Sequence, residues 1–277
     1  MKTIFTLLLL IILTKLADCQ VQGEYIENQI QPTVLIEIGK YNGSGIIVGD
    51  RHDTVYLVTA KHVLFDEESR FKNLLDSEAK IHLHAKDFKS DKPTFFNLDL
   101  KYLLLNSMIL VDSVHDICAV KIGIREVTGA MKYFNGISRT GHRANFIIYP
   151  LNNSLNKNDL YLGENVFIVG FPSSIGLKQY PQFDYNMPLL KRGSIAGISF
   201  KYDNIIIDSP VYHGNSGGPV FLERKDFNSY KIYLIGIVSQ YIPFISQTVF
   251  KKDLTKEVSS YGVIIPIEFC KKLIYKH

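Results

Sequence analysis

Apolar residues in this chain come in short runs that are rich in β-branched side chains and are separated by Gly, Asn, Asp and Pro. Runs of this length, bounded by turn-forming residues, predict β-strands rather than helices. Their spacing favours an all-β barrel or sandwich over alternating strand–helix–strand units. The expected strands cover residues 34–38, 45–48, 54–59, 80–84, 103–111 and 117–122 in the first half, and 165–170, 193–200, 204–208, 219–222, 230–238 and 262–266 in the second.

A polar stretch, residues 139–158, divides these strands into two sets and is predicted to be a connector. After the last strand, residues 267–275 show the spacing of an amphipathic helix, which would close the fold. The apolar positions of that helix are Ile267, Phe269, Cys270, Leu273 and Ile274.

The composition is that of a soluble globular protein, with 46% hydrophobic and 21% charged residues. The formal net charge is only +4, and the basic residues are spread along the chain. A solvated surface explains this distribution better than a nucleic-acid-binding patch does. We therefore expect no nucleic-acid partner.

The N-terminus has the features of an export signal. A lysine follows the first methionine, and the apolar run 4–14 has the length of a signal-peptide core and is too short to span a bilayer comfortably. Ala17-Asp18-Cys19 places small residues around a cleavage point, so residues 1–19 are expected to be a signal peptide. This predicts a secreted or periplasmic protein with no membrane span in the mature chain.

Two alternatives stay open for the N-terminus: a lipoprotein signal with a lipid anchor on Cys19, which Asp18 disfavours, and an uncleaved anchor. Cleavage after Cys19 would leave Gln20 as the first mature residue and two cysteines in the chain. Cys118 lies in an apolar run and is expected to be a small buried hydrophobic residue, whereas Cys270 lies in the predicted helix. The sequence leaves open whether the two form a disulfide.

The segment with the most chemical information is Gly-Asn-Ser-Gly-Gly-Pro at 214–219. Its glycines let the backbone fold tightly around Ser216, because glycine has no Cβ to restrict φ. Such a turn can expose the hydroxyl while nearby N–H groups point at one spot, as acyl transfer requires. For this motif by itself, a structural hairpin turn is the alternative.

A serine nucleophile needs a base and a group that fixes the tautomer of that base. His62 follows an apolar run, and Asp116 opens another. Both lie at the end of a predicted strand, where loops carry functional groups on a rigid scaffold. Each position also suits a plain surface histidine or a turn-forming aspartate, so the hypothesis depends on the agreement of all three segments.

Together these segments resemble the trypsin-like (chymotrypsin-fold) serine peptidases. Residues 59–62 match the family's Thr-Ala-x-His pattern. Asp-Ile-x-Ala-Val at 116–120 matches its aspartate pattern, and 214–219 matches Gly-Asp/Asn-Ser-Gly-Gly-Pro. The resemblance covers nearly the whole chain from about Val34 onward.

The resemblance implies an all-β fold of two six-stranded antiparallel β-barrels with a short C-terminal α-helix. On that pattern, residues 20–277 form one peptidase domain. Its expected parts are a first barrel at about 30–138, a connector at 139–158, a second barrel at 159–266 and a helix at 267–275.

The same resemblance implies a serine endopeptidase acting on protein or peptide substrates without a cofactor or a metal. His62 would be the general base, Asp116 would orient it, and Ser216 would attack the carbonyl and form an acyl-enzyme. The N–H groups of Gly214 and Ser216 would form the oxyanion hole. Ser239 matches the serine that supports the aspartate. The oligomeric state stays open.

One departure separates the chain from the animal enzymes. Asn215 stands where they carry an aspartate that pairs with a new N-terminal amine after zymogen cleavage. Because an asparagine cannot form that ion pair, we expect no zymogen switch of this kind, as in HtrA-type peptidases. The scarcity of cysteines also suggests this bacterial branch. The chain after Ser216 is expected to hold the second barrel and no PDZ domain of the kind many HtrA-type peptidases carry.

The substrate pocket is expected to involve the residues before Ser216 and two later segments. The position six before the serine is a proline and not an acid, so a preference for Arg or Lys is not supported. We expect a neutral or apolar pocket, formed by Pro210, His213, Gln240, Tyr241 and Gly262.

Other histidines have plainer explanations. His82 and His84 would share one strand face and could bind a metal, but no nearby Cys or carboxylate completes the set. A solvated strand face is expected instead. His115, beside Asp116, is assigned no chemistry.

Three functions remain compatible with this fold. The leading hypothesis is a secreted serine endopeptidase. An HtrA-like quality-control peptidase would need assembly or activation, and predicts trimers and activation by peptides. A catalytically silent binding module is the third, although the retention of His62, Asp116 and Ser216 argues against it.

Overall fold

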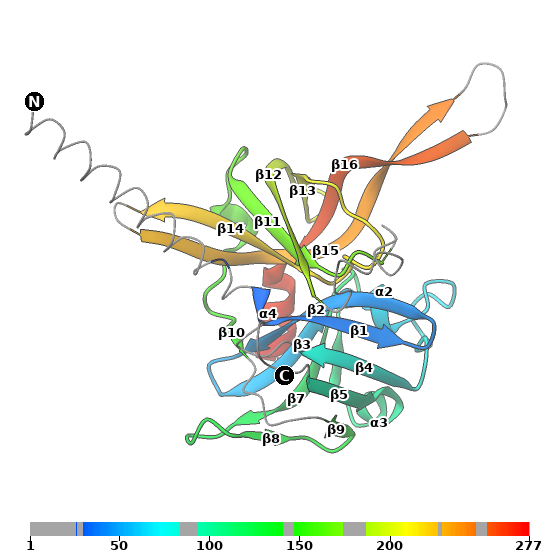
Figure 1. Cartoon of the computed structure of the whole chain (residues 1–277), viewed down its shortest axis with the longest axis vertical. Helices are drawn as coiled ribbons and strands as arrows, with labels where there is room; N and C mark the ends of the chain where they lie inside the picture. Colours follow the sequence, from blue (N-terminus) through cyan, green and yellow to red (C-terminus); the bar gives the residue numbers. More distant parts are fainter. Residues whose placement is uncertain are drawn as a thin grey trace, which may run out of the picture.

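The computed structural model describes residues 30–83, 94–140, 147–173, 187–226, 229–247 and 254–276, together with Ile26. The described chain forms two β units, one above the other in Figure 1. The predicted all-β fold with a short C-terminal helix is confirmed. No helix in these ranges has the length and apolar character needed to cross a membrane.

The first unit is a ten-stranded sheet. Its strands are β1 (Thr33–Ile38), β2 (Tyr41–Gly49), β3 (Thr54–Thr59), β4 (Glu78–Leu83), β5 (Thr94–Asp99), β6 (Ile109–Val111), β7 (Cys118–Arg125), β8 (Met131–Tyr133), β9 (Ile137–Thr140) and β10 (Tyr149–Pro150). The hydrogen-bonded path runs β6-β7-β3-β2-β1-β4-β5-β9, with β10 on β2 and β8 on β7. The described strands of this unit therefore form a half-barrel whose path ends at β6 and β9.

The second unit is a closed six-stranded barrel in the order β11-β12-β13-β16-β15-β14. Its strands are β11 (Asn165–Gly170), β12 (Leu189–Ser199), β13 (Asn204–Asp208), β14 (Pro219–Asp226), β15 (Ser229–Gln247) and β16 (Leu254–Pro266). Side chains alternate between the two faces of a strand. In β13, Ile205 and Ile207 are accordingly fully buried in the barrel, while Ile206 between them is not.

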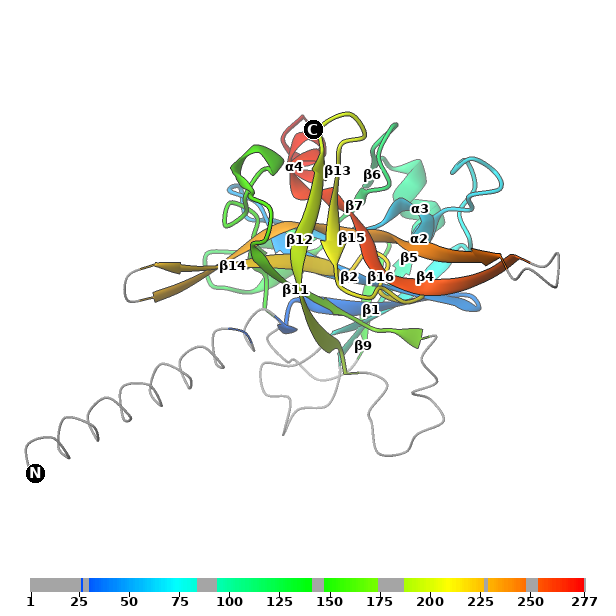
Figure 2. The same ribbon diagram turned by 90° about the horizontal axis from the view of Figure 1, so that it is seen from above.

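Two strands of the barrel are much longer than the sequence pattern predicted. β15 and β16 continue to pair from Pro243–Val258 to Gln247–Leu254 and project from the barrel as a two-stranded ribbon (Figure 1 and Figure 2, orange and red). Register shifts near Gln240 and Pro243 precede the ribbon. Because bulges of this kind bend and twist a strand, they direct the ribbon away from the barrel.

The expected strand at 103–111 is only partly correct. Its first residues belong to helix α3 (Leu100–Leu105), and only the last three form β6. The Asp99 carboxylate caps this helix by accepting a hydrogen bond from the Tyr102 N–H at 2.8 Å. The helix ends before Ser107, which has a positive φ of 56°. The capped segment therefore forms a helix, although its apolar run suggested a strand.

The predicted connector takes part in the core. Within it, β10 pairs in parallel with β2, and Tyr149 and Leu151 are buried. The Tyr149 hydroxyl lies 2.7 Å from the carbonyl oxygen of Asn153 and 3.2 Å from that of Ile232, and it accepts a hydrogen bond from the Leu234 N–H at 3.2 Å. One buried hydroxyl thus joins the connector to β15. A short 3₁₀-helix, η1 (Lys157–Asp159), follows.

The expectation of a solvated strand face at His82 is wrong. His82 is 5% exposed, and its Nε2 lies 2.6 Å from Oε2 of Glu37 on the neighbouring strand β1. The partner lies far away in sequence, so the local pattern gave no sign of it. His84 lies outside the described residues. Within those residues, no group of three His, Cys, Asp or Glu side chains could hold a metal ion.

The C-terminal helix, α4 (Ile267–Lys276), lies where the sequence predicted it and contacts strands of both units. Its apolar face, which includes Phe269 and Cys270, joins the same core as β7 of the first unit. Cys118 is fully buried in that core, as predicted, and both cysteines are free thiols.

We expect Tyr149→Phe to lower the free energy of unfolding by about 0.5–1.5 kcal/mol, because it removes the buried hydrogen bonds of this hydroxyl to Asn153, Ile232 and Leu234. Urea denaturation measures this. Tyr161→Phe is the matched control: Tyr161 is 69% exposed, and its change should lie within about 0.5 kcal/mol. Equal unfolding midpoints for the two variants would contradict the bridging role of Tyr149.

Candidate active site

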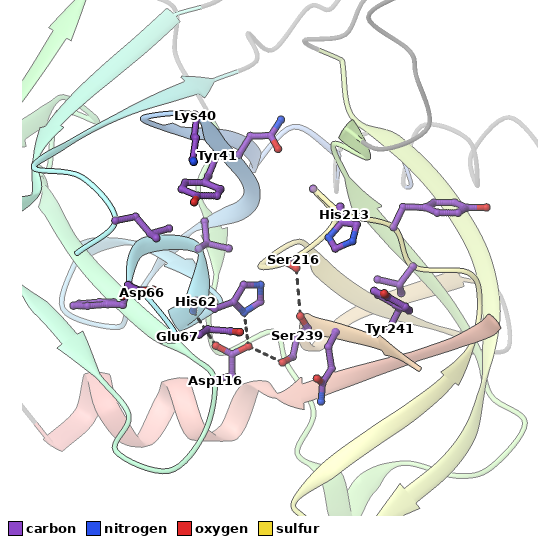
Figure 3. Close-up of a pocket in the computed structure, with 18 of the residues that line it drawn as sticks. Lys40, Tyr41, His62, Asp66, Glu67, Asp116, His213, Ser216, Ser239 and Tyr241 are labelled. Carbon is purple, nitrogen blue, oxygen red and sulfur yellow. Dashed lines mark hydrogen bonds and ion pairs between the residues drawn. The ribbon is translucent and has the colours of Figure 1, made fainter. Parts of the chain in front are cut away.

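A cavity of about 580 Å³ is lined by residues of both β units (Figure 3). Most of the residues that the sequence singled out lie on its wall. They are His62, Asp116, His213, Gly214, Ser216, Ser239, Gln240 and Tyr241. Pro210 and Gly262, expected in the substrate pocket, are not among its lining residues.

His62 lies on a one-turn helix, α2 (Lys61–Leu64), that follows β3. Its backbone N–H donates to Oδ1 of Asp116 at 3.0 Å, and its ring Nδ1 lies 2.8 Å from Oδ2 of the same carboxylate. The neighbouring Lys61 donates from Nζ to the carbonyl oxygen of Asp112 at 3.0 Å. Helix α2 is therefore tied to the β6–β7 loop that carries Asp116.

Asp116 lies just before β7 and accepts a third hydrogen bond, from the Ser239 hydroxyl at 2.6 Å. Burial by itself would raise the pKa of Asp116, but the hydrogen bonds and charge of His62, together with the Ser239 hydroxyl, lower it below its ordinary value. Burial would lower the pKa of His62, but the hydrogen bond and charge of Asp116, with a smaller contribution from Glu67, raise it above 6.5. The pair is thus arranged to stabilise an imidazolium beside a carboxylate.

Ser216 lies in the turn between β13 and β14, where two glycines adopt positive φ: Gly214 at 93° and Gly217 at 80°. A Cβ on Gly214 would lie 2.2 Å from the carbonyl oxygen of Phe171, and one on Gly217 would lie 2.1 Å from that of Ser44. Both the backbone conformation and the close approach of neighbouring backbone therefore require glycine at these two positions.

The amides of this turn fall into two groups. The N–H groups of Asn215, Gly217 and Gly218 donate to the carbonyl oxygens of Tyr212, Val238 and Asn215. In the described structure, the N–H groups of Gly214 and Ser216 donate to no protein acceptor, and both residues line the cavity. The turn thus has two N–H donors available at one side of the serine.

The Ser216 hydroxyl donates to the backbone carbonyl oxygen of Ser239 at 3.3 Å (Figure 3). In the described part of the chain, this hydroxyl makes no hydrogen bond to the His62 ring. Figure 3 shows both side chains on the same cavity, with Asp116 and Ser239 below them.

Ser44 holds the turn from the other β unit, and sequence reasoning missed it. Its N–H donates to the carbonyl oxygen of Ser216 at 2.8 Å, and its hydroxyl donates to that of Gly214 at 2.6 Å. The same hydroxyl accepts from the Phe171 N–H at 2.9 Å. The available signal was Gly43-Ser44-Gly45, a cluster of small residues at the start of the strand predicted for 45–48, which marks a close approach of another backbone.

One wall of the cavity is aromatic. The rings of His213 and Tyr241 meet edge to face with centroids 5.6 Å apart, and Tyr212 lies beside them on the wall. Gly262 is screened by a side chain of that wall, because a Cβ placed on it would lie 2.4 Å from Cγ2 of Val211. Pro210 lies behind the wall, where its carbonyl oxygen accepts a hydrogen bond.

The opposite wall comes from the first unit and was also not predicted. Lys40 and Tyr41 lie across the cavity from His213 and Tyr241 (Figure 3). Next to His62, the wall carries the acidic side chains Asp66, Glu67 and Glu68.

Residues 43–227 match the family described as trypsin-like peptidase domain. No curated protein matches the sequence. Among solved structures, Deg5 is similar with a TM-score of 0.50 and 17% identity, over 91% of each chain. The HtrA-type protease AlgW with a tripeptide is similar with a TM-score of 0.47 and 15% identity, over 89% of this chain and 60% of that chain. The inactive form of the Rv3671c protease of M. tuberculosis is similar with a TM-score of 0.48 and 12% identity, over 93% of this chain and 94% of that chain.

The likeness to Deg5 shows the two-unit β fold that the sequence predicted. The family match spans about two thirds of the chain and contains His62, Asp116 and Ser216. On this match, the chain belongs to the trypsin-like peptidases and is a serine-type peptidase.

Proposed function

We propose that this peptidase cleaves internal peptide bonds through His62, Asp116 and Ser216, with an acyl-enzyme intermediate. The observation that carries the proposal is the Asp116 carboxylate, which is held between the His62 ring and the Ser239 hydroxyl on the cavity that Ser216 lines. A carboxylate bound to Nδ1 keeps the proton on that nitrogen, so Nε2 has a free lone pair to accept a proton.

In the resting state Ser216 must turn before it reacts. Among the described residues, its hydroxyl is held by the Ser239 carbonyl oxygen alone, at a long 3.3 Å. A rotation about χ1 would break this single hydrogen bond and bring Oγ toward Nε2 of His62. Active-site hydrogen bonds often shorten only when substrate is bound. His62 then takes the hydroxyl proton as Oγ attacks the carbonyl carbon, and later donates it to the leaving amine.

The unpaired N–H groups of Gly214 and Ser216 would bind the oxygen of the tetrahedral intermediate. Fixed donors of this kind stabilise the charge that develops in the transition state, and they need no reorganisation when it appears.

The substrate side chain beside the scissile bond would lie against the His213, Tyr212 and Tyr241 wall. Apart from the His62 and Asp116 pair, the charged side chains of the cavity belong to the opposite wall and are Asp66, Glu67, Glu68 and Lys40. We therefore propose that the pocket prefers an uncharged side chain.

We also propose that residues 20–277 form the exported peptidase, with residues 1–19 removed as a signal peptide. Lipidation of Cys19 is the alternative. Mass spectrometry of the mature N-terminus distinguishes a free Gln20 from a lipid-modified Cys19.

A fluorophosphonate probe, which forms a covalent bond with an activated serine, tests the nucleophile. We expect labelling that peptide mapping places on Ser216, that Ser216→Ala abolishes and that His62→Ala strongly reduces. Ser173→Ala is the control, because the hydroxyl of Ser173 donates to the carbonyl oxygen of His213 beside the same turn, and it should label normally. Unlabelled, correctly folded wild-type protein would overturn the proposal.

The raised pKa of His62 makes activity pH-dependent. Below that pKa the imidazole is protonated and cannot act as a base, so kcat/KM should fall at acid pH with a midpoint above 6.5. Asp116→Asn removes the main interaction that raises this pKa while burial remains. The His62 pKa, followed by NMR titration, should then fall, and kcat should drop by about 10⁴-fold. Glu67→Gln should lower the pKa only slightly, and an unchanged pKa in Asp116→Asn would contradict this account.

Ser44→Ala should reduce both stability and activity. It removes the two buried hydrogen bonds of this hydroxyl, to the Gly214 carbonyl oxygen and from the Phe171 N–H, which costs about 1–3 kcal/mol. It also frees the turn, so probe labelling should slow. Thr33→Val is a matched control, because the buried Thr33 hydroxyl has no hydrogen-bond partner among the described residues and lies outside the cavity wall. Labelling of Ser44→Ala at the wild-type rate would exclude a role in positioning the turn.

A further inference from the structure

We propose that Lys191 is a positioning residue, whose ammonium group holds the turn carrying Ser216 so that the Gly214 and Ser216 N–H groups stay available to the substrate. The inference rests on the proposed function, since it concerns the same nucleophile and the same donors.

Lys191 lies on β12 and is partly buried beneath the segment that precedes Ser216. Its Nζ donates to the carbonyl oxygen of Pro210 at 3.0 Å and approaches Oδ1 of Asn215 at 3.5 Å. It also lies 3.8 Å from the centroid of the Tyr212 ring. One cation therefore contacts three residues of a single short segment, through a carbonyl, a carboxamide and an aromatic face.

Asn215 connects this cation to the site. It is 1% exposed and directly precedes Ser216. Its Oδ1 also accepts from the Tyr212 N–H at 3.1 Å, and its own N–H donates to the Tyr212 carbonyl oxygen at 3.0 Å. Any shift of Asn215 would move the peptide group that carries the Ser216 N–H, and it would displace Gly214, whose N–H lies one peptide unit further back. Lys191 thus acts on the donors through Asn215.

Lys191 places a positive charge beside the side chain of residue 215, where the sequence indicated no cation. Asn215 stands at a position where the animal enzymes place an aspartate against a new N-terminal amine. Here the side-chain oxygen of Asn215 is approached by an ammonium group from within the folded chain. The turn can therefore be supported without cleavage of a precursor.

The surroundings of Lys191 make this support sensitive to pH. Burial lowers the pKa of Lys191 to about 8, and no charged side chain contributes to the shift. Tyr212 is the titratable group in contact with it, and the neighbouring Arg192 is engaged with Glu223 at 3.1 Å. Hydrogen bonds from an ammonium are roughly twice as strong as those from a neutral amine. The charged hydrogen bonds from Lys191 to the turn are thus present below about pH 8, and they weaken as the pH rises through that value.

A direct role in choosing acidic substrates is the competing explanation. Lys191 is not among the residues that line the cavity, so its Nζ acts on the turn rather than on a substrate side chain. The two roles differ in their kinetics. Loss of positioning lowers kcat for every substrate, whereas loss of a specificity contact raises KM for acidic substrates alone.

The test compares wild type with Lys191→Met, Lys191→Arg and Asn215→Asp, and uses Lys201→Met as the control. Lys201 is an exposed lysine just after the same strand, so its removal changes the net charge equally. For each protein, kcat and KM are measured from pH 6 to 10 on one neutral and one acidic peptide.

We expect Lys191→Met to lower kcat on both peptides at pH 7 by tenfold or more, toward the roughly 10²–10³-fold cost of losing one oxyanion-hole donor. The wild-type fall in kcat near pH 8 should be absent from this variant. Lys191→Arg should keep most of the activity and lose the fall near pH 8, because a guanidinium stays charged. Asn215→Asp should move the fall to higher pH, because a carboxylate stabilises the ammonium.

A Lys191→Met enzyme with wild-type kcat and pH profile overturns the proposal, and so does a loss confined to the acidic peptide. If Lys191→Met does not fold, an unmoved alkaline limb in both Lys191→Arg and Asn215→Asp overturns it.

Hydrogen exchange gives a readout that does not need activity. Amides of residues 211–216 should exchange faster in Lys191→Met than in Lys201→Met, even if the wild type fails to label with the probe. Labelling failure would thus count against the proposed function, and unchanged exchange against the role of Lys191.

Discussion

The position of Ser216 depends on hydrogen bonds that cross the boundary between the two β units. Ser44 on β2 bonds to the carbonyl oxygens on either side of Asn215, and Ser239 on β15 bonds to Asp116 at the start of β7. Neither β unit contains the whole site. The packing of the half-barrel against the closed barrel therefore sets the distances on which the chemistry depends, and helix α4 strengthens that packing because it joins both units.

The proposed base, His62, and the proposed nucleophile, Ser216, are held very differently. Asp116 accepts hydrogen bonds from the His62 backbone, the His62 ring and the Ser239 hydroxyl, so the imidazole has one orientation. Among the described residues, the Ser216 hydroxyl has a single long hydrogen bond. If the two residues act as proposed, a fixed base lies beside a nucleophile that rotates about χ1, and the reorganisation before attack is small.

Local patterns predicted those parts of the molecule that local physics determines. Short apolar runs bounded by turn-forming residues located most strands, and the glycines at 214 and 217 marked a turn that their φ values require. The features that the sequence did not predict arise from distant partners. Ser44 acquires its role from a turn 170 residues away, and His82 is buried against Glu37 on another strand. One missed feature is local: Asp99 caps helix α3, which takes up the first residues of an expected strand.

Burial of the two cysteines affects how the fold responds to oxidants. Cys118 and Cys270 are fully buried, so a dissolved oxidant or disulfide has no access to either sulfur in the folded chain. Burial also raises the pKa of both thiols above the ordinary range, which disfavours the reactive thiolate. The folded core thus protects its own thiols against oxidation and crosslinking, and that protection is lost when the core opens.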